Sequence, residues 1–153
     1  MAYKEKTKSE LKKDFLKYLI SIRRIKNINT NVHRYATELA RDYIKRKVKR
    51  NRETIVNMDL NPGPSPGKDI FIKTNKETHY AEVLCNDSYK EGEQFKKLCK
   101  DIDKLKRARA TKKYLFLLSK TQQEKVAKKL SKQKISLDGI KILTIFQRKN
   151  GFI

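Results

Sequence analysis

Asp69 and Glu82 are two carboxylates of the stretch from Pro66 to Asn86, which is typical of two strands joined by a turn. Asp69 precedes the apolar run Ile70–Ile72, and Glu82 lies at the centre of the β-prone run His79–Cys85. A charged Glu in such a strand is costly unless a cation, a metal ion or water at the strand end pairs with it. Neighbouring strands lie roughly 5 Å apart, so a hairpin can bring Asp69 and Glu82 together. Two hard oxygen ligands at that separation suit Mg²⁺.

A third acid, Glu38, falls within a predicted helix that runs from about residue 31 to residue 49. Apolar residues recur along this segment at the spacing of one helix face, and Glu38 lies beside that stripe among arginines and lysines. Two interpretations stay open. Glu38 is an ordinary salt-bridged surface residue, or it faces Asp69 and Glu82 as an outer acid of the same site.

The strongest global feature is an excess of positive charge. The chain has 153 residues, and its 39 lysines and arginines against 17 acids give a formal net charge of +22. Such a charge disfavours the compact state through self-repulsion, which indicates a polyanionic partner, with nucleic acid as the first candidate. An AT-rich genome can explain many lysines but not the shortage of acids. An anionic membrane surface is the minor competitor.

Several cations are clustered where they could bind phosphates. Six of the eight residues from 45 to 52 are basic, although such a run can also be a merely solvated face. Lys68 lies beside Asp69, and a third predicted helix has a basic outer face and a basic exit. The residues that we expect to contact nucleic acid are Lys45, Arg46, Lys49, Arg50, Arg52, Lys68, Lys96, Lys97, Arg107 and Arg109.

The composition favours one domain, residues 1–153, with a lean core, because 37% of the residues are apolar. The chain has no run of about 18 apolar residues, and its first residues lack the features of a signal peptide, so we expect neither a transmembrane span nor a signal peptide and count no membrane among the expected partners. Cys85 and Cys99 fit a reducing cytoplasm and are expected to be small buried hydrophobes. Together with the scattered His33 and His79 they do not make a zinc site. We expect a cytoplasmic protein.

Periodicity and turn residues predict an α/β fold with the order α-α-β-β-β-α-β-α-β. We expect a mixed β-sheet flanked by helices on both faces, with an antiparallel hairpin first and partly parallel pairing later. The expected elements are an N-terminal helix at 9–26 capped by Thr7 or Ser9, a helix at 31–49, a strand at 54–60, a stiff proline-rich loop at 61–67, the hairpin, a helix from about 91, a buried strand at 113–119, a helix starting at the capping box Thr121–Glu124, and an edge strand at 140–146.

This order of elements, with Asp69 starting the second strand and Glu82 inside the third, resembles the PD-(D/E)XK nuclease superfamily. Type II restriction endonucleases and archaeal Holliday-junction resolvases share that core. Lys68-Asp69 matches the "PD" element, and Glu82-Val83-Leu84 matches the "(D/E)XK" element. Twelve residues separate the two acids, a spacing common in the superfamily. The resemblance covers about residues 31–119 and rests mainly on element order, because the motif is short.

Leu84 stands where that family has a lysine, which orients or activates the attacking water and offsets phosphate charge. Leucine can do neither. Three explanations stay open: the lysine has moved to another element, the chain binds nucleic acid without cutting it, or the leucine was introduced to trap an uncleaved state. The candidates for a displaced lysine are Lys73, Lys90, Lys96 and Lys97.

The resemblance implies a Mg²⁺-dependent DNA endonuclease of the restriction-endonuclease-like class. Asp69, Glu82 and the backbone carbonyl of Val83 would then hold Mg²⁺, which lowers the pKa of a bound water and stabilises charge on the scissile phosphate. Glu38 would hold an outer-sphere water, and Leu84 would occupy the remaining catalytic position. Two-fold symmetric double-stranded DNA would be read by a homodimer.

Two other functions stay open. One is a non-enzymatic nucleic-acid-binding protein on a nuclease scaffold, which Leu84 favours and the retained Asp69 and Glu82 oppose. The other is a ribosome-associated or RNA-binding basic protein. Aromatic residues between the cations would support base stacking in that case, but the tyrosines and phenylalanines fall mostly on the predicted core stripes.

Overall fold

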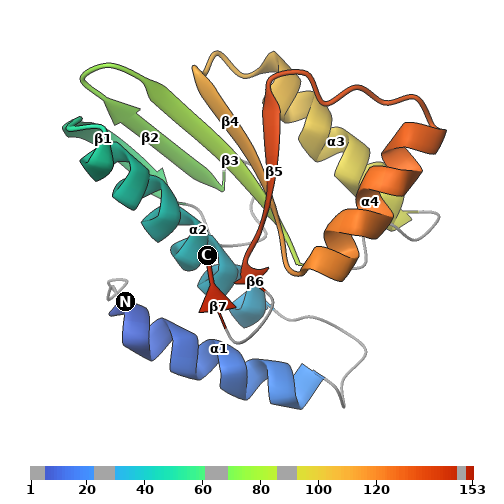
Figure 1. Ribbon diagram of the computed structural model, residues 1–153, viewed down its shortest axis with the longest axis horizontal. Helices are drawn as coiled ribbons and strands as arrows, with labels where there is room; N and C mark the ends of the chain where they lie inside the picture. The colour runs from blue at the N-terminus through green and yellow to red at the C-terminus, as the bar shows by residue number, and fades with distance from the viewer. Residues whose placement is uncertain (1–5, 23–29, 61–68, 86–92, 148–150) are drawn as a thin grey trace.

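The computed structural model describes residues 6–22, 30–60, 69–85, 93–147 and 151–153 (Figure 1). The helices are α1 (Lys8–Ile22), α2 (Thr30–Arg50), α3 (Glu93–Arg107) and α4 (Lys120–Lys132). The strands are β1 (Ile55–Leu60), β2 (Ile70–Thr74), β3 (Thr78–Leu84), β4 (Lys112–Leu117), β5 (Ile140–Thr144), β6 (Phe146–Gln147) and β7 (Gly151–Phe152). The predicted proline-rich loop at 61–67 lies outside the described residues.

The first five strands form one mixed sheet in the order β1-β2-β3-β4-β5. The pairs β1–β2 and β2–β3 are antiparallel, whereas β3–β4 and β4–β5 are parallel. The parallel pairs are joined through α3 and α4, because parallel strands need a crossover that returns the chain to the same end of the sheet. The expected α/β fold, its element order and its mixed sheet are therefore confirmed, and β5 is an edge strand as expected.

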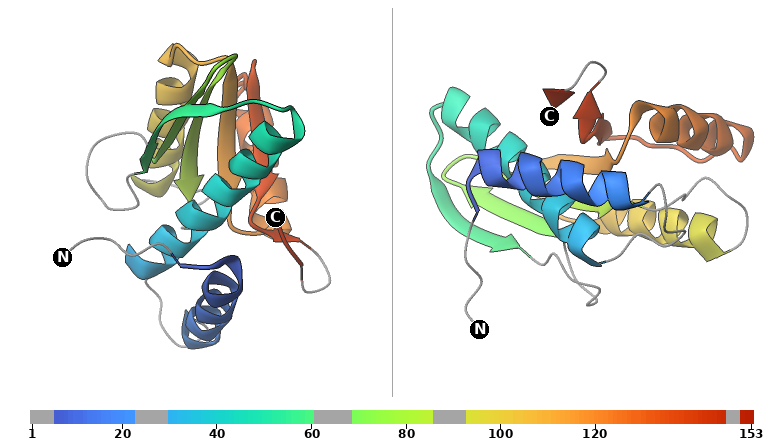
Figure 2. Two further views of the ribbon diagram at one scale, coloured as in Figure 1. Left: turned by 90° about the vertical axis from the view of Figure 1, so that its left-hand side faces the viewer. Right: turned by 90° about the horizontal axis from the view of Figure 1, so that it is seen from below.

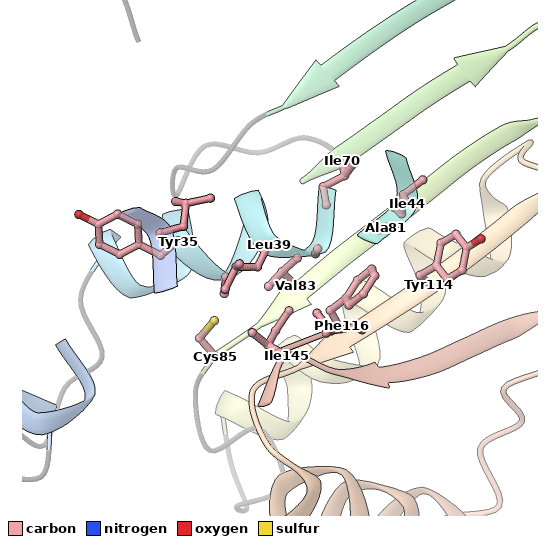
Figure 3. Packing of buried hydrophobic residues seen from close by; sticks show 14 of the residues in the cluster. Tyr35, Leu39, Ile44, Ile70, Ala81, Val83, Cys85, Tyr114, Phe116 and Ile145 are labelled. Carbon is pink, nitrogen blue, oxygen red and sulfur yellow. The ribbon is translucent and has the colours of Figure 1, made fainter. Parts of the chain in front are cut away.

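The sheet separates two apolar layers, because successive side chains of a strand point to opposite faces. On one face, Ala81 and Val83 of β3 pack with Leu39 and Ile44 of α2 and with Phe116 of β4 (Figure 3). The other face is covered by α3 and α4. The buried residues of this second layer are Tyr80, Leu84, Leu98, Ile102, Leu105, Leu115, Leu117, Val126, Leu130 and Ile140. The layers confirm that helices flank both faces.

Two helix starts are capped by side chains. Thr7 and Glu10 form a reciprocal pair at the start of α1: the Glu10 N–H donates to Thr7 Oγ1, and the Thr7 N–H donates to Glu10 Oε2. Thr7 is thus the cap, not Ser9. The prediction for the fourth helix is wrong by two residues. Ser119, whose Oγ accepts from the Gln122 N–H, caps α4, because the chain turns into the helix directly after β4.

The chain ends in a short hairpin, β6–β7, that the sequence did not predict, because two-residue strands carry no periodicity. This hairpin lies beside α1 in the views of Figure 2. The Phe146 ring stacks on Phe15 of α1 with centroids 4.8 Å apart, and the Ile153 N–H donates to the Ile145 carbonyl. The C-terminal residues therefore hold α1 against the rest of the fold. The predicted continuation of the first helix to residue 26 lies outside the described residues.

Both cysteines are free thiols. Cys85 is buried, as expected, and burial raises the pKa of its thiol to about 12, whereas Cys99 is half-buried. In the described part of the chain, no helix combines the length and the apolar character needed to cross a bilayer.

Candidate functional site

Asp69 and Glu82 lie directly opposite each other across the β2–β3 hairpin. Ile70 at the start of β2 pairs with Ala81, so the residue before Ile70 faces the residue after Ala81. Antiparallel neighbours have Cβ atoms roughly 5 Å apart. The register of the hairpin thus places the two carboxylates next to each other on adjacent strands, as predicted.

Asp69 is fixed by the backbone of β3. The Val83 N–H donates a hydrogen bond of 2.8 Å to Asp69 Oδ2. His33 of α2 lies beside the same group, with its Nε2 3.0 Å from the Val83 carbonyl oxygen and 3.5 Å from Asp69 Oδ2. The carbonyl that we expected to bind a metal ion is therefore already in contact with His33.

Glu82 lies on the other side of the pair, under α3, with 3% of its surface exposed. The Tyr80 hydroxyl donates to Glu82 Oε1 at 2.6 Å, and Lys104 Nζ lies 3.7 Å from the same oxygen. Lys104 Nζ also lies 3.3 Å from Asp101 Oδ1 one helical turn earlier. Glu82 thus shares a buried cluster with a second acid, a phenol and a lysine.

The cluster has more negative than positive charge. Burial, followed by the nearby Asp69, raises the pKa of Glu82 to about 8, although Tyr80 and Lys104 act against the rise. Burial also raises the pKa of Asp101. Burial acts to lower the pKa of Lys104, but the carboxylates of Glu82 and Asp101 outweigh it and the pKa is raised. A further cation near Glu82 would let both acids ionise at neutral pH.

Glu38 lies apart from this cluster. Glu82 points to the α3 face of the sheet, whereas α2 covers the opposite face. Glu38 is 1% exposed, and its Oε2 has no hydrogen-bond partner among the described residues. Burial raises its pKa to about 7, opposed by Arg41. Glu38 is therefore neither a surface residue nor placed beside the Glu82 carboxylate.

Leu84 is a core residue. It is 2% exposed and packs in the apolar layer beneath α3. Of the candidates for a displaced lysine, Lys73, Lys96 and Lys97 are exposed, and Lys90 lies outside the described residues. The lysine that the structure places at Glu82 is Lys104, which was not among those candidates.

The expected nucleic-acid-binding residues fall into separate groups. Lys45, Arg46 and Lys49 line a cleft of about 610 Å³ between the end of α2 and the start of β1. Arg50 and Arg52 follow it, exposed. Lys96 and Lys97 are exposed in the first turns of α3, and Arg107 and Arg109 are exposed at its other end. Lys68 lies outside the described residues.

The structure also offers a possible metal site in another place. Among the described residues, the one group of three or more His, Cys, Asp or Glu side chains whose ligand atoms all lie within 4.8 Å of one another is Glu53, Glu77 and His79. That group lies at the turn of the β2–β3 hairpin, whereas Asp69 precedes the opposite end of β2. Side chains that could hold a metal ion are therefore present at the turn of this hairpin, where the sequence did not predict a metal site.

Sequence reasoning missed the partners that lie far from the hairpin along the chain. His33, Asp101 and Lys104 reach the acid pair only because α2 and α3 pack on the two faces of β3. One partial signal was present in the sequence: Asp101 and Lys104 lie three apart, which places them on one side of α3, although this spacing does not say which strand they reach. Tyr80, two residues before Glu82 on the same strand, could have been found from the strand alternation.

Neither a protein-family model, nor a curated protein, nor a solved structure matches this chain.

Proposed function

We propose that this protein is a divalent-metal-dependent endonuclease that hydrolyses phosphodiester bonds of DNA, on a fold like that of the PD-(D/E)XK superfamily. The observation that carries the proposal is the Glu82 cluster: a buried carboxylate opposite Asp69, beside Asp101, with Lys104 as the cation at its oxygen. Buried acids are retained at a cost unless a cation pairs with them. In a chain of net charge +22, a buried acidic cluster is the reverse of the prevailing pattern.

The residues present fit Mg²⁺. Among the described residues, the Tyr80 hydroxyl and the Lys104 ammonium both contact Oε1 of Glu82. The other oxygen, Oε2, can therefore bind a metal ion. Asp69 supplies a second hard oxygen from the neighbouring strand, and Mg²⁺ needs only one or two carboxylates because it keeps several waters. The Val83 carbonyl would serve as a third ligand only if His33 gave up its contact. The metal ion would supply an activated water and stabilise charge on the phosphate.

In this proposal Lys104 does the work of the lysine that Leu84 replaces. Its ammonium lies at the same carboxylate that the motif lysine would neighbour, but it is held from α3 instead of β3. Asp101 keeps Lys104 charged and oriented, and 45% of the lysine side chain is exposed and so accessible to a substrate. The Tyr80 hydroxyl fixes the rotamer of Glu82. Lys104 would hold the attacking water or offset phosphate charge.

The basic residues near the acid cluster and those of the α2 cleft lie towards opposite ends of β2, so that one DNA strand could contact both groups. Lys97 lies towards the acid cluster, because its charge acts on Asp101. The cleft with Lys45 and Lys49 adjoins Ile55, which pairs with Thr74 at the far end of β2. The five residue steps from Asp69 to Thr74 span roughly 17 Å. That length corresponds to about five nucleotides of one DNA strand.

Two copies of the chain are part of the proposal. The edge strand β1 has an exposed face, with Val56 64% and Met58 37% exposed, the two exposed large hydrophobic side chains among the described residues. β1 is also the first strand in the order of the sheet, and an edge strand can pair with a second chain. A homodimer would match a two-fold symmetric DNA site.

A second candidate is a protein that binds DNA without cutting it. Its supporting observation is Leu84, which has become part of the core instead of the site. The RNA-binding alternative has weaker support. Base stacking needs exposed aromatic rings, but Tyr35, Tyr80, Tyr114 and Phe116 are all buried.

Incubation with supercoiled plasmid at low salt tests the proposal. We expect Mg²⁺-dependent conversion to open and linear forms, no cleavage with EDTA, and a loss of at least about 100-fold in rate for Asp69→Asn or Glu82→Gln. Glu124→Gln, a change to an exposed acid on α4, is the matched control. A mobility shift without cleavage in every condition would favour the binding protein.

A further inference from the structure

The second acidic group, Glu53, Glu77 and His79, contains a buried nitrogen that makes no hydrogen bond within the described part of the chain. His79 is 1% exposed, and its Nε2 has no hydrogen-bond partner among the described residues. Glu77 Oε2, which is also buried and also without a hydrogen-bond partner there, lies 3.8 Å from that nitrogen. A buried polar atom without a partner costs free energy, so two such atoms aimed at each other indicate a missing group between them.

The three side chains come from three parts of the fold that the backbone locks together. Glu53 follows α2, Glu77 lies in the turn of the β2–β3 hairpin, and His79 is in β3. The Asn75 N–H donates to the Thr54 carbonyl, and the Thr54 N–H donates to Asn75 Oδ1. These bonds hold the end of α2 against the turn. The ligand atoms of the group all lie within 4.8 Å of one another.

His79 is poised to act as a neutral ligand. Its Nδ1 lies 3.4 Å from the Tyr114 hydroxyl, and the two rings are nearly parallel with centroids 6.1 Å apart. A histidine that binds a metal through one ring nitrogen usually donates the N–H of the other to a neighbouring group, which fixes the ring. Burial lowers the pKa of His79, although Glu77 and Glu53 act to raise it. The neutral imidazole is the form that binds metals.

We propose that Glu53, Glu77 and His79 form a binding site for one divalent transition-metal ion, with Zn²⁺ as the metal that suits it best. A neutral imidazole nitrogen with two carboxylates and one water satisfies the four-coordinate preference of Zn²⁺. Mg²⁺ is a poorer occupant because it prefers oxygen ligands and keeps most of its waters. The bound ion would clamp the end of α2 to the β2–β3 turn.

This site is separate from the acid pair of the proposed nuclease. His79 and Glu82 lie three residues apart on β3, which is roughly 10 Å along the strand, and their side chains point to opposite faces of the sheet. The inference therefore stands or falls without the proposed function. It also revises the expectation that the histidines of this chain take part in no zinc site.

Nearby cations offer the competing explanation. Lys112 Nζ lies 3.7 Å from Glu77 Oε1, and the charges of Lys47 and Lys76 act on His79 and Glu53. The acids would then be balanced by lysines alone, with no metal ion. That explanation leaves His79 Nε2 without a hydrogen bond to any described residue, and it predicts no change in stability when Zn²⁺ is added.

The test is Zn²⁺ titration of protein stripped with a chelator, followed by calorimetry and by thermal unfolding, in a Glu82→Gln background that disables the other acid pair. We expect one Zn²⁺ per chain, a higher Tm with Zn²⁺, and visible absorption of bound Co²⁺. Glu77→Gln and His79→Gln should each weaken Zn²⁺ binding by at least about tenfold, and Mg²⁺ at equal concentration should not compete.

Glu124→Gln is the control and should leave Zn²⁺ binding unchanged. Should His79→Gln not fold, Glu77→Gln and Glu53→Gln still decide, because both glutamates are only partly buried. The proposal would be overturned if the parent protein did not bind Zn²⁺. It would also be overturned if Glu77→Gln and Glu53→Gln bound Zn²⁺ as strongly as the parent protein.

Discussion

Glu82 occupies a position where an apolar residue would make a better core. Its neighbours on the same face of β3 are Tyr80 and Leu84, and α3 covers all three. Burial raises the pKa of Glu82 to about 8, so the isolated protein holds a proton there that the unfolded chain would release at neutral pH. A buried acid at this position is explained if a cation binds it during function. The raised pKa of Glu82 in the absence of that cation can be tested.

The first prediction concerns pH. The pKa of Glu82 is about 8 in the fold against the ordinary 4.5, so the fold is progressively penalised as the pH rises between those values. In EDTA, the free energy of unfolding should fall across this range, and Glu82→Gln should remove much of the fall. The measurement is urea unfolding at about pH 5 and about pH 8. Glu38→Gln should remove a further part that ends near pH 7.

Glu124→Gln serves as the control, because it changes an exposed carboxyl group on α4. If the Glu82→Gln protein showed the same pH dependence as the parent protein, burial would not raise the pKa of Glu82 in the isolated chain.

The second prediction concerns Leu84. Leu84→Lys introduces the lysine of the motif that this chain resembles and places an ammonium group in the apolar layer beneath α3, where Leu84 is 2% exposed. We expect a loss of at least about 3 kcal/mol in the free energy of unfolding. Leu84→Met, which keeps the volume and apolar character, should cost less than about 1.5 kcal/mol. A Leu84→Lys protein as stable as the Leu84→Met protein would disprove the assignment of Leu84 to the core.

At the scale of elements, helix boundaries decide which side chains reach the site. One face of α3 packs on the sheet through apolar residues, and Asp101 and Lys104 lie on α3 beside that face. A slip of one residue would turn Lys104 away from Glu82, because each helical residue advances by about 100°. The cap of α4 matters less to the site, but it gives a direct test of how the chain leaves β4.

The third prediction separates two possible caps of α4. Ser119→Ala removes the side-chain oxygen that accepts from the Gln122 N–H and should cost about 1 kcal/mol of stability. Thr121→Ala changes the residue that the sequence pattern indicated and should cost much less, because Thr121 lies inside the helix. Equal costs for the two variants, measured by urea unfolding, would contradict the structure at this boundary.

The elements could largely be predicted because their signals are local. Ala36, Leu39 and Tyr43 mark one face of α2 by spacings of three and four, and the run around Phe116 is apolar enough to be buried on both faces. The acid pair could be predicted because hairpin register depends on nearby residues. Lys104 could not, because its place at Glu82 results from packing between α3 and β3, a contact that no local spacing encodes. The hairpin β6–β7 was missed because its strands are too short to show a pattern.

At the scale of the whole molecule, the chain carries a net charge of +22, and the described basic residues that we expect to contact nucleic acid fall into separate groups. One basic group lines the cleft at the end of α2, and another lies along α3. Between them lies the sheet, with the acid cluster under α3. If a polyanion contacts both groups, as in the proposed function, its binding should depend strongly on salt.

The fourth prediction is a salt dependence. If six or more phosphates are contacted, log affinity should fall with log salt at a slope of about −5 or steeper, measured by fluorescence anisotropy with duplex DNA. Lys45→Gln combined with Lys49→Gln should reduce the magnitude of the slope by about 2, because each phosphate contact contributes about 0.9. A slope near −1 for the unmodified chain would reject the broad basic surface.

The most direct test of the central claim is single-turnover cleavage of plasmid DNA in Mg²⁺ by the Lys104→Met protein. Lys100→Met, a change to an exposed lysine one turn earlier on α3, is its matched control. We predict that Lys104→Met lowers the cleavage rate by about 100-fold with little change in DNA affinity, and that Lys100→Met leaves the rate unchanged. Equal cleavage by both variants would contradict the assignment of Lys104 to the site of a nuclease.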